Sequence, residues 1–362
     1  MTKLQLLSRL PRYRRYHRRL KGNPPLPLNV TVSLLYSCNS RCMTCNVYEK
    51  KVENFTVEEY RRTFASLGTA PYWFTMSGGE PFLRKDIVDI CRAAYDYCQP
   101  GIINIPTNGS LYKVIPDRVK QIATYARNTE IIINLSLDEV GTEHDRIRGF
   151  PGNWQRAMET YRQLKELSKK HANLTIGIHT VISQFNVARF PEIYRELIQL
   201  EPDSYITEVA EERVELGTIG EAITPDANSY AGAIDFLIAE MKKKKPSGVA
   251  GIAQAFRYEY YRMVKEYLKK PRQVIPCYAG VVSAQISPDG DVWPCCIRAD
   301  SMGNLRENDY DFYRVWNSPQ AMKIRKSIKN RECACPLANA GYTNMLMNVS
   351  SLMKVANHLI RS

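Results

Sequence analysis

The 362-residue sequence predicts an α/β fold built as a full or partial (β/α) barrel. Six short β-rich runs alternate with amphipathic helical stretches, which is the pattern of a parallel sheet covered by helices. Polar motifs follow four of these runs, at the places where barrel proteins carry their chemistry. The chain is long enough for this large domain and a smaller one.

The predicted elements follow one another in a regular order along the chain. The strand runs are 29–35, 71–76, 101–107, 131–138, 174–182 and 204–209. The helical stretches, with apolar residues three or four apart, are 56–67, 84–98, 115–126, 153–170 and 189–200. Thr56 with Glu59 has the pattern of a capping box at the first helix. The polar motifs at the strand ends are SCNSRCMTC, SGGEP, TNGS and SLDEV.

The pattern then changes in the second half of the chain. Residues 226–270 are predicted to form two helices joined near KKKKPSG, a helical linker whose lysines we expect at a solvated helix end. From 271 to 340 apolar and polar residues alternate around a turn at Pro288, Asp289 and Gly290, which indicates a β-hairpin and a second small domain. The barrel itself occupies residues 27–225.

Residues 341–362 form a predicted amphipathic C-terminal helix. Its apolar residues recur at helical spacing, and they are Val349, Leu352, Met353, Ala356 and Leu359. We expect this helix to dock on the protein's own surface, with a membrane or a partner protein as the alternative.

The net charge of +13 is concentrated at the N-terminus. Residues 1–22 hold eight Lys or Arg and no acid, and they belong to a basic arm over 1–26 that the prolines of GNPPLPLN separate from the rest of the chain. Such an arm can follow phosphates of a nucleic acid or a membrane surface, or remain a solvated or disordered tail. The sequence has neither an apolar run of transmembrane length nor a secretory signal, so we expect a cytoplasmic protein with a peripheral membrane contact as an option.

Ten cysteines in a cytoplasmic protein point to metal or redox chemistry, because stable disulfides are rare there. Cys91 and Cys98 lie on a helical pattern and are expected to be small buried residues. The other eight form two groups, Cys38, Cys42 and Cys45 near the start and Cys277, Cys295, Cys296, Cys333 and Cys335 near the end.

The first group has the spacing C-x3-C-x2-C and lacks a fourth ligand. A structural zinc site needs four N or S ligands, and no further Cys or His lies nearby. An iron–sulfur cube held by three thiolates keeps one iron open, and an open iron can bind a small molecule through an amino and a carboxylate group.

Here the chain resembles the radical S-adenosylmethionine (SAM) superfamily. The triad Cys38, Cys42 and Cys45, the SGGEP motif, NGS, SLD and RIRGFPGNW stand in the family's order between about residue 30 and residue 210. The resemblance implies a partial (β/α)6 TIM-like barrel and a [4Fe-4S] cluster that binds SAM. It also implies reductive cleavage of SAM to a 5′-deoxyadenosyl radical, which abstracts a hydrogen atom from the substrate, with a reductant such as flavodoxin or ferredoxin as a partner.

The resemblance also implies residues that bind the cofactor. Arg148 is the candidate for binding the SAM carboxylate, because a guanidinium donates two parallel hydrogen bonds to a carboxylate. The other candidates are Gly78, Gly79 and Glu80 near the SAM amine, and Asn108, Ser136 and Asp138 beside SAM or the substrate. Where many members have an aromatic residue this chain has Thr44, so Tyr48 is a candidate for the adenine contact. The catalytic residue remains unknown.

The second cysteine group resembles the auxiliary-cluster domain of these enzymes, in its short twitch form instead of the full SPASM form. We expect one auxiliary [4Fe-4S] cluster held by Cys277, Cys295, Cys333 and Cys335, with a zinc site as the alternative. Cys296 is expected to face away, because adjacent residues in a strand point to opposite faces.

The substrate is not determined by these motifs. Oxidation, epimerisation or cross-linking of a peptide or a small metabolite is the first hypothesis, and a lipid or lipid-linked substrate at a membrane surface is an alternative. A non-enzymatic iron–sulfur or zinc protein that binds nucleic acid is a further alternative, based on the basic arm alone.

Overall fold

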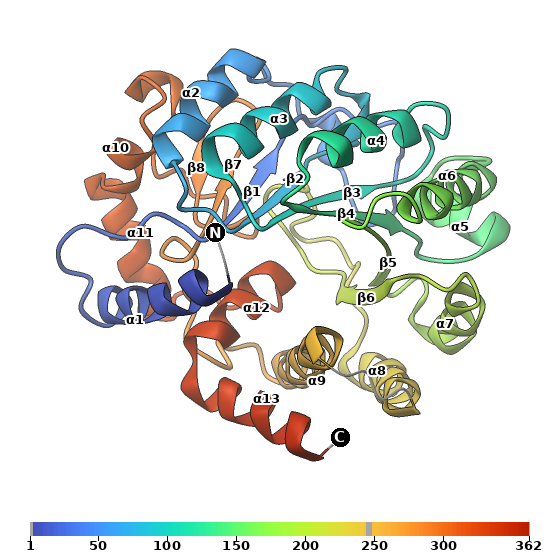
Figure 1. Cartoon of the computed structure of the whole chain (residues 1–362). Coiled ribbons are helices and arrows are strands. Elements are labelled where there is room, and N and C mark those ends of the chain that lie inside the picture. Colours follow the sequence, from blue (N-terminus) through green and yellow to red (C-terminus); the bar gives the residue numbers. More distant parts are fainter. Residues whose placement is uncertain (1–2, 244–247, 362) are drawn as a thin grey trace.

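The structure is a computed structural model that describes residues 3–243 and 248–361, and its centre is one open eight-stranded sheet (Figure 1). The strand order is β6-β5-β4-β3-β2-β1-β7-β8. All neighbouring strands are parallel except β7 and β8. The strands are β1 (Asn29–Ser33), β2 (Trp73–Ser77), β3 (Ile102–Thr107), β4 (Glu130–Ser136), β5 (Leu174–Ile182), β6 (Ser204–Val209), β7 (Ser283–Ile286) and β8 (Val292–Trp293). The predicted partial barrel is thus confirmed, with all six predicted strands in place.

Alternation along the strands separates a core face from a cavity face. Val30, Phe74, Ile103 and Ile131 form a buried row across β1 to β4 that packs under the helices. The next residue on each of the first three strands, such as Asn104 on β3, is polar and lines the inner cavity. A period of two therefore places apolar residues outward and polar residues inward.

Helices cover the outer face of the sheet. They are α2 (Val57–Leu67), α3 (Ile87–Cys98), α4 (Ile115–Tyr125), α5 (Gly141–Arg148), α6 (Asn153–Ser168) and α7 (Phe190–Ile198), with 3-10 turns at Val47–Glu49, Pro81–Leu83 and Val187–Arg189. The capping box of Thr56 and Glu59 is present at α2. Cys91 and Cys98 lie on the buried face of α3, as expected. Only α5 among these helices was not predicted, because its sequence carries no apolar periodicity.

Helices α9 (Gly248–Lys269) and α12 (Ala338–Met347) lie across the open side of the barrel, between the ends of the sheet in Figure 1. Helix α8 (Ala227–Lys243) precedes them and packs beside α7. Tyr260 of α9 stacks on Tyr342 of α12 with 5.1 Å between ring centroids. The predicted helix pair at 226–270 is confirmed, although lysines 244 and 245 of its junction lie outside the described residues.

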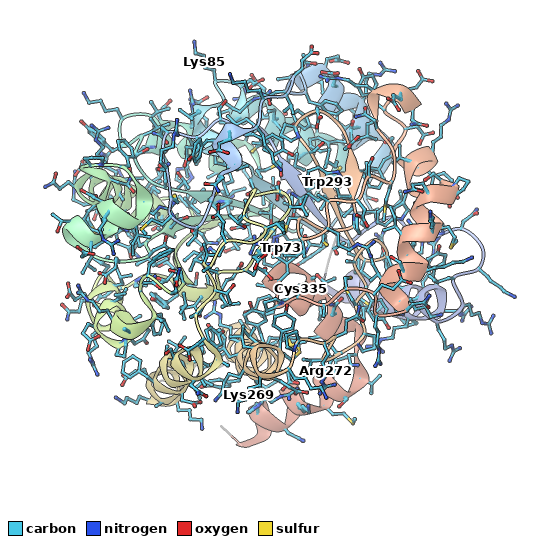
Figure 2. The ribbon with its side chains drawn as sticks, turned by 180° about the vertical axis from the view of Figure 1, so that it is seen from behind. Trp73, Lys85, Lys269, Arg272, Trp293 and Cys335 are labelled. Carbon is cyan, nitrogen blue, oxygen red and sulfur yellow. The ribbon has the colours of Figure 1, made fainter. Side chains whose placement is uncertain are left out.

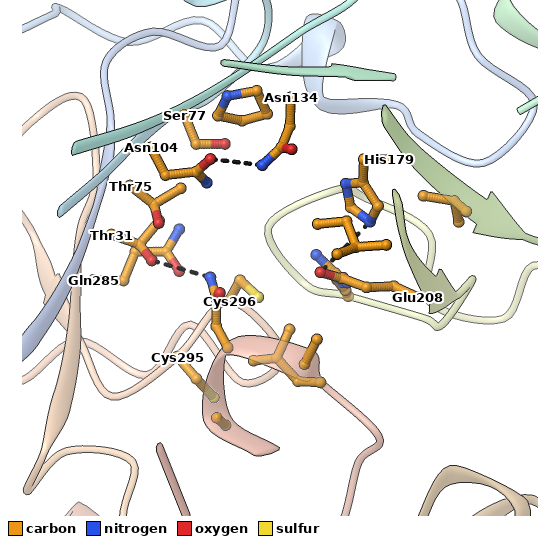
Figure 3. A pocket seen from close by; sticks show the side chains of 18 of the residues that line it. Thr31, Thr75, Ser77, Asn104, Asn134, His179, Glu208, Gln285, Cys295 and Cys296 are labelled. Atoms are coloured by element: carbon orange, nitrogen blue, oxygen red, sulfur yellow. Dashed lines mark hydrogen bonds and ion pairs between the residues drawn. The ribbon is translucent and has the colours of Figure 1, made fainter. Parts of the chain in front are cut away.

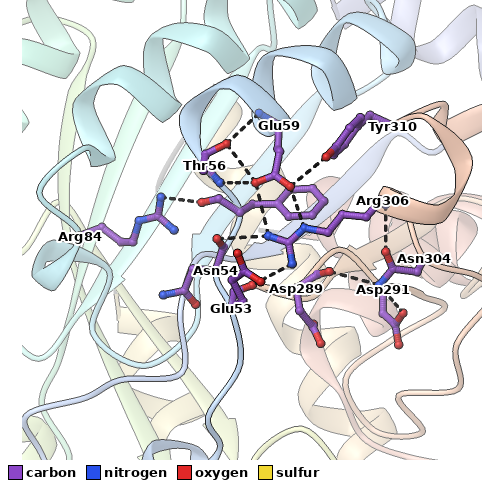
Figure 4. A network of polar contacts seen from close by, with 11 residues as sticks. Glu53, Asn54, Thr56, Glu59, Arg84, Asp289, Asp291, Asn304, Arg306 and Tyr310 are labelled. Carbon is purple, nitrogen blue, oxygen red and sulfur yellow. Dashed lines mark hydrogen bonds and ion pairs between the residues drawn. The ribbon is translucent and has the colours of Figure 1, made fainter.

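The β-hairpin of the second half extends the barrel sheet. Its strand β7 pairs in parallel with β1, and β8 closes the hairpin after the turn at Gly290. A 3-10 turn (Arg306–Asn308) and helices α10 (Phe312–Trp316) and α11 (Pro319–Lys329) follow. Figure 4 shows Arg306 from this region at the Glu59 carboxylate of α2, with an Nε–Oε1 distance of 2.7 Å. The small C-terminal unit is thus joined to the barrel by backbone pairing and by the ion pair between Arg306 and Glu59.

The N-terminal arm is a docked helix, so the expectation of a solvated or disordered tail is wrong for residues 3–19. Helix α1 (Lys3–Arg19) buries Leu10, Tyr13 and Tyr16 against a cluster that includes Tyr278. Apolar residues three apart on one face of this basic segment provide the contact, and the high charge obscured them.

The C-terminal segment forms two helices, α12 and α13 (Val349–Arg361), where one was predicted. The expected docking on the protein's own surface is confirmed, because α13 packs along α9 and Lys354 lies 3.4 Å from Glu259. The predicted contact face was wrong: Val355 is buried, while Val349 and Met353 are 56% and 58% exposed. Within the described residues, every helix is too short or too polar to cross a membrane.

Candidate active site

The loop after β1 carries the first cysteine triad and is held by the end of α5. The Arg41 amide donates to the Arg148 carbonyl at 3.0 Å, and the Met43 amide donates to the Ile147 carbonyl at 2.9 Å. Gly149 ends α5 with φ +56°, and a Cβ there would lie 2.1 Å from the Arg41 carbonyl oxygen. The RIRGFPGNW motif therefore contains a glycine because the cysteine loop passes directly against it.

The three thiols of this loop lie close enough to influence one another and line one cavity. Burial raises the pKa of Cys38 and Cys42, and raises that of Cys45 to about 12. The charge of Cys42 also contributes to the raised pKa of Cys45. Burial opposes a free thiolate at these positions, and a bound metal or cluster would supply the positive charge that a thiolate ligand needs.

Arg148 is the cation opposite the triad. Burial by itself lowers the pKa of its guanidinium, but the neighbouring Cys42 and Asp138 raise it above the usual value. Its Nη1 donates to Asp138 Oδ2 at 2.8 Å, whereas its buried Nε has no partner among the described residues. Asp138 also accepts a hydrogen bond from the Val181 amide at 2.9 Å, and this second contact holds the carboxylate that orients Arg148. Asp138 itself does not line the cavity.

The SGGEP motif supports the cysteine loop from the end of β2. A Cβ on Gly78 would lie 2.2 Å from the Leu35 carbonyl oxygen, and a Cβ on Gly79 would lie 2.1 Å from the Ser37 carbonyl oxygen. The Gly79 amide donates to the Leu35 carbonyl at 2.7 Å. The missing side chains thus make room for the backbone of the cysteine loop, and a contact of this turn with a bound SAM stays a prediction.

Glu80 and Asn108 are buried connectors between three loops. Glu80 accepts from the amides of Phe82 and Asn108 and from Thr107 Oγ1, at 2.8–3.1 Å. Asn108 donates through Nδ2 to Asn39 Oδ1 at 2.8 Å, next to Cys38. Both oxygens of Glu80 are therefore engaged with the protein, which makes it a positioning residue for the loop.

The structure brings most of the predicted SAM contacts to one cavity. Gly78, Gly79, Glu80, Asn108, Ser136 and Arg148 line it together with Cys38, Cys42, Cys45 and Thr44. Tyr48 does not line it, since the Arg41 guanidinium covers its ring at 4.1 Å, and the proposed ring contact with adenine is not supported.

The second cysteine set lies around the end of the hairpin. Cys277, Cys333 and Cys335 line a small pocket beside α9, and Cys295 lies near them, since Cys277 and Cys333 contribute to its raised pKa. Cys296 packs against Leu337 and Ala340 and faces the large cavity. Both residues follow the end of β8 at Trp293 and lie in a turn, so the strand alternation expected for them is wrong and the turn separates their surroundings.

In the part of the chain that the structure describes, no three His, Cys, Asp or Glu side chains converge as one metal ion would require. Three or four thiolates that each bind a different iron of a cube are necessarily farther apart. The arrangement therefore fits clusters, and which cysteines bind them stays a prediction.

One cavity of about 630 Å³ connects the triad with Cys295 and Cys296. Figure 3 shows polar side chains from successive strands facing it, among them Asn104, Asn134, His179 and Glu208. Asn134 Nδ2 donates to Asn104 Oδ1 at 2.7 Å. In Figure 2, Trp73, Trp293 and Cys335 lie toward the centre of the view, whereas Lys85 projects from the outline of the molecule. The strand residues were missed in the sequence, although their inward alternation was the available signal.

Several buried polar atoms along this cavity have no hydrogen-bond partner among the described residues, and they include Asn134 Oδ1 and Glu211 Oε2. His179 Nε2 lies 3.6 Å from Glu208 Oε1, at the edge of an ion pair. Burial raises the pKa of Glu211 to about 7, although the adjacent Arg213 lowers it. Buried polar atoms without partners are costly, so these atoms are available to water or to a ligand that enters the cavity.

The fold and these two cysteine sets define a class of iron–sulfur enzymes that carry one three-cysteine and one auxiliary site. The radical SAM superfamily model matches residues 32–197, and the SPASM model, an iron–sulfur cluster-binding domain, matches residues 277–336. This chain belongs to the radical SAM superfamily and carries a SPASM-type auxiliary cluster domain.

Similar curated proteins include the subtilosin biosynthesis protein AlbA of Bacillus subtilis and the AdoMet-dependent heme synthase of Methanosarcina barkeri. AlbA is 25% identical over 83% of this chain and 62% of its own length, so this chain spans less than two thirds of AlbA. The heme synthase is 23% identical over 85% of this chain and 87% of its own length. The pre-heme d1 synthase of Dinoroseobacter shibae is 25% identical over 49% of this chain and 42% of its own length.

Solved structures confirm the fold. Streptococcus suis SuiB bound to S-adenosylmethionine superposes with a TM-score of 0.61 at 16% identity, over 89% of this chain and 72% of SuiB. The enzyme anSMEcpe with bound AdoMet has a TM-score of 0.60 at 14% identity, over 93% of this chain and 98% of its own. The family implies a SAM-binding [4Fe-4S] cluster and auxiliary cluster binding, which the two thiol sets described above fit.

Proposed function

We propose that this protein is a radical SAM enzyme that removes a hydrogen atom from a polar substrate held in the cavity between its two cysteine sets. The single observation that carries this proposal is the continuity of that cavity from Cys38, Cys42 and Cys45 to Cys295 and Cys296. When bound, the cluster and SAM supply a 5′-deoxyadenosyl radical able to break an unactivated C–H bond.

The residues of the chain would hold the reactants in place. Arg148 would bind the SAM carboxylate through its unpartnered Nε, with Asp138 fixing the orientation of the guanidinium. Asn134 Oδ1 and Glu211 Oε2 would accept hydrogen bonds from the substrate. Helices α9 and α12 shield the cavity from water on the open side of the barrel.

A peptide is the proposed substrate. Similar proteins include AlbA, the sporulation killing factor maturation protein SkfB and a PqqA peptide cyclase, and SuiB has been seen with its precursor peptide. An auxiliary cluster beside Cys295 suits an oxidation or a cross-link, because a substrate radical must lose a further electron. Epimerisation needs no such electron acceptor.

A small metabolite is the second candidate. The heme synthase covers most of this chain and most of its own length, and the cavity is bounded by helices on its open side. A compact substrate fits such an enclosed volume.

The test is anaerobic reconstitution with iron and sulfide, reduction with dithionite, and quantification of 5′-deoxyadenosine formed from SAM. We expect formation by the wild type and none by Cys42→Ala, with Cys91→Ala as the matched control that retains activity. An equal yield from the wild type and Cys42→Ala would refute the enzyme proposal.

Substrate class is tested separately by adding size-fractionated extract of the source cells to the active enzyme. The peptide proposal would be overturned if the peptide fraction still accelerated SAM cleavage after digestion with a protease. It would also be overturned if only the metabolite fraction accelerated SAM cleavage. Stimulation that protease treatment abolishes would support it.

A further inference from the structure

We propose that helices α1 and α13 form one surface that binds anionic lipid membranes. The first part of this surface is a row of arginines on α1. Arg12, Arg15 and Arg19 are exposed and lie three and four residues apart, so they share one face of the helix. No carboxylate among the described residues forms an ion pair with them.

The arginine row has a fixed position because the opposite face of α1 is buried. Tyr13 donates from its hydroxyl to the Leu26 carbonyl, and the ring of His17 stacks on Tyr278 with 3.9 Å between centroids. Burial of Leu10 and Tyr16 completes the contact. A helix held in this way presents its charges in one direction, which a loose tail would not do.

The second part is the exposed apolar stripe of α13. Val349 and Met353 are 56% and 58% exposed, and the exposed Ala356 continues the stripe at helical spacing. The packed side of the same helix is formed around Val355, which is buried. Exposed side chains of this size on one stripe mark a binding face more often than scattered single residues do.

Helix α12 brings the two parts together. Arg14 donates to the carbonyls of Leu346 and Met347 at 2.9 and 3.0 Å, and Val349 begins α13 two residues later. Figure 1 shows α12 beside both α1 and α13, which each contact it. The start of the apolar stripe therefore lies next to the arginine-bearing helix.

A lipid surface is the occupant that uses both parts. Arginines near an anionic membrane each gain electrostatic attraction, and apolar side chains of an amphipathic helix enter the boundary between headgroups and acyl chains. A nucleic acid would engage the arginines through its phosphates but would leave Val349 and Met353 in water. The combination of charge and apolar surface selects the membrane.

The test is sedimentation of the full-length protein, with its clusters reconstituted, on sucrose-loaded vesicles. Vesicles of phosphatidylcholine alone are compared with a phosphatidylcholine–phosphatidylglycerol mixture. We expect binding to the mixture only, weakened by salt. The triple variant Arg12→Gln, Arg15→Gln, Arg19→Gln should lower the partition coefficient by at least about tenfold.

Two matched controls distinguish this surface from general effects. Lys120→Gln, Arg127→Gln, Lys170→Gln removes the same charge from exposed positions near α4 and α6, and should bind as the wild type does. Met353→Ser should weaken binding several-fold, whereas Ile219→Ser, at a residue that is 61% exposed, should not. Thermal melting and iron content verify that each variant is folded.

Three results would overturn the proposal. The first is that the wild type does not bind vesicles, and the second is that the two charge variants lose vesicle binding equally. The third is that the wild type binds single-stranded RNA but no vesicles, and that Met353→Ser does not change the RNA binding. The last result would assign the arginines to nucleic acid.

Discussion

At the scale of single residues, adjacent cysteines on the hairpin have different surroundings. Cys295 lies near Cys277 and Cys333, while Cys296 lies near Arg213, although both residues line the cavity. Both thiols are buried, and burial raises the pKa of each, so acidity does not separate them. Their neighbours in the turn after β8 do.

This difference gives the first prediction. Cys295→Ala should lose the auxiliary cluster and about half of the bound iron, because each cube holds four irons and one auxiliary cluster is proposed. Cys296→Ala should keep the full iron content, since its thiol lies beside Arg213 and not beside Cys277 and Cys333. Iron and sulfide assays with the visible absorption spectrum measure both, and iron loss in Cys296→Ala would show that the assignment is reversed.

Arg148 offers a second prediction at this scale. Arg148→Lys keeps the positive charge but loses the planar fork, so SAM should bind about tenfold more weakly or worse. Arg146→Lys is the matched control, because Arg146 is exposed and pairs with Glu143. Equilibrium dialysis with labelled SAM on reconstituted protein measures the affinity. Unchanged affinity in Arg148→Lys, with iron content retained, would remove Arg148 from the SAM site.

At the scale of elements, loops position the site and glycines allow the loops to meet. Gly149 and Gly152 both have positive φ, at +56° and +77°, and they lie on either side of the same turn. A Cβ on Gly149 would meet the backbone of Arg41, whereas a Cβ on Gly152 would meet nothing within 4 Å. The two positions therefore separate backbone strain from contact with the cysteine loop.

Alanine at these positions gives the third prediction. Gly152→Ala should cost about 1–2 kcal/mol of unfolding free energy from the left-handed conformation alone. Gly149→Ala should cost more and should also lower iron retention at the Cys38, Cys42 and Cys45 loop, because that loop must move. Urea unfolding and iron analysis compare the variants, and equal iron retention would contradict the positioning role of Gly149.

The sequence predicted elements well where local pattern and tertiary structure agree. The six strands of the barrel are apolar runs buried under helices, so period and burial coincide. Helix α5 was missed because its residues GTEHDRIR are held by contacts with the cysteine loop instead of an apolar face. The contact face of α13 was wrong because periodicity finds an apolar stripe but not the side that is covered.

Site residues that belong to sequence motifs could be predicted, whereas site residues that come together only through the pairing of strands could not. The three cysteines of the first loop and Arg148 follow from family motifs, and the structure places them around one cavity. Asn134, His179 and Glu208 carry no motif and stand far apart in the sequence. Only strand register brings them together, and register between parallel strands depends on packing along the whole sheet.

At the scale of the whole molecule, the hairpin region is bound to the barrel by a charged contact as well as by strand pairing. The Glu59 carboxylate accepts from Arg306 Nε at 2.7 Å and from the Tyr310 hydroxyl at 3.0 Å (Figure 4). Its side chain is 14% exposed. Burial by itself raises the pKa of Glu59, but hydrogen bonds from Arg306, Thr56 and Tyr310 lower it to about 2.

The lowered pKa gives the last prediction, with a defined pH window. Because the folded protein favours the ionised carboxylate, this stabilisation is present above the ordinary pKa of 4.5 and is lost as the pH falls toward about 2. Glu59→Gln should therefore lower the unfolding free energy by about 1–3 kcal/mol at neutral pH. The difference from the wild type should shrink below about pH 4.5.

Glu58→Gln is the matched control for this prediction, because Glu58 lies on the same helix and its side chain is 68% exposed. It should change stability by less than about 0.5 kcal/mol, as expected for an exposed ion pair. Urea unfolding followed by circular dichroism across this pH range measures all three proteins. A Glu59→Gln deficit that stays constant down to the lowest accessible pH would mean that packing, and not the carboxylate charge, joins α2 to the hairpin region.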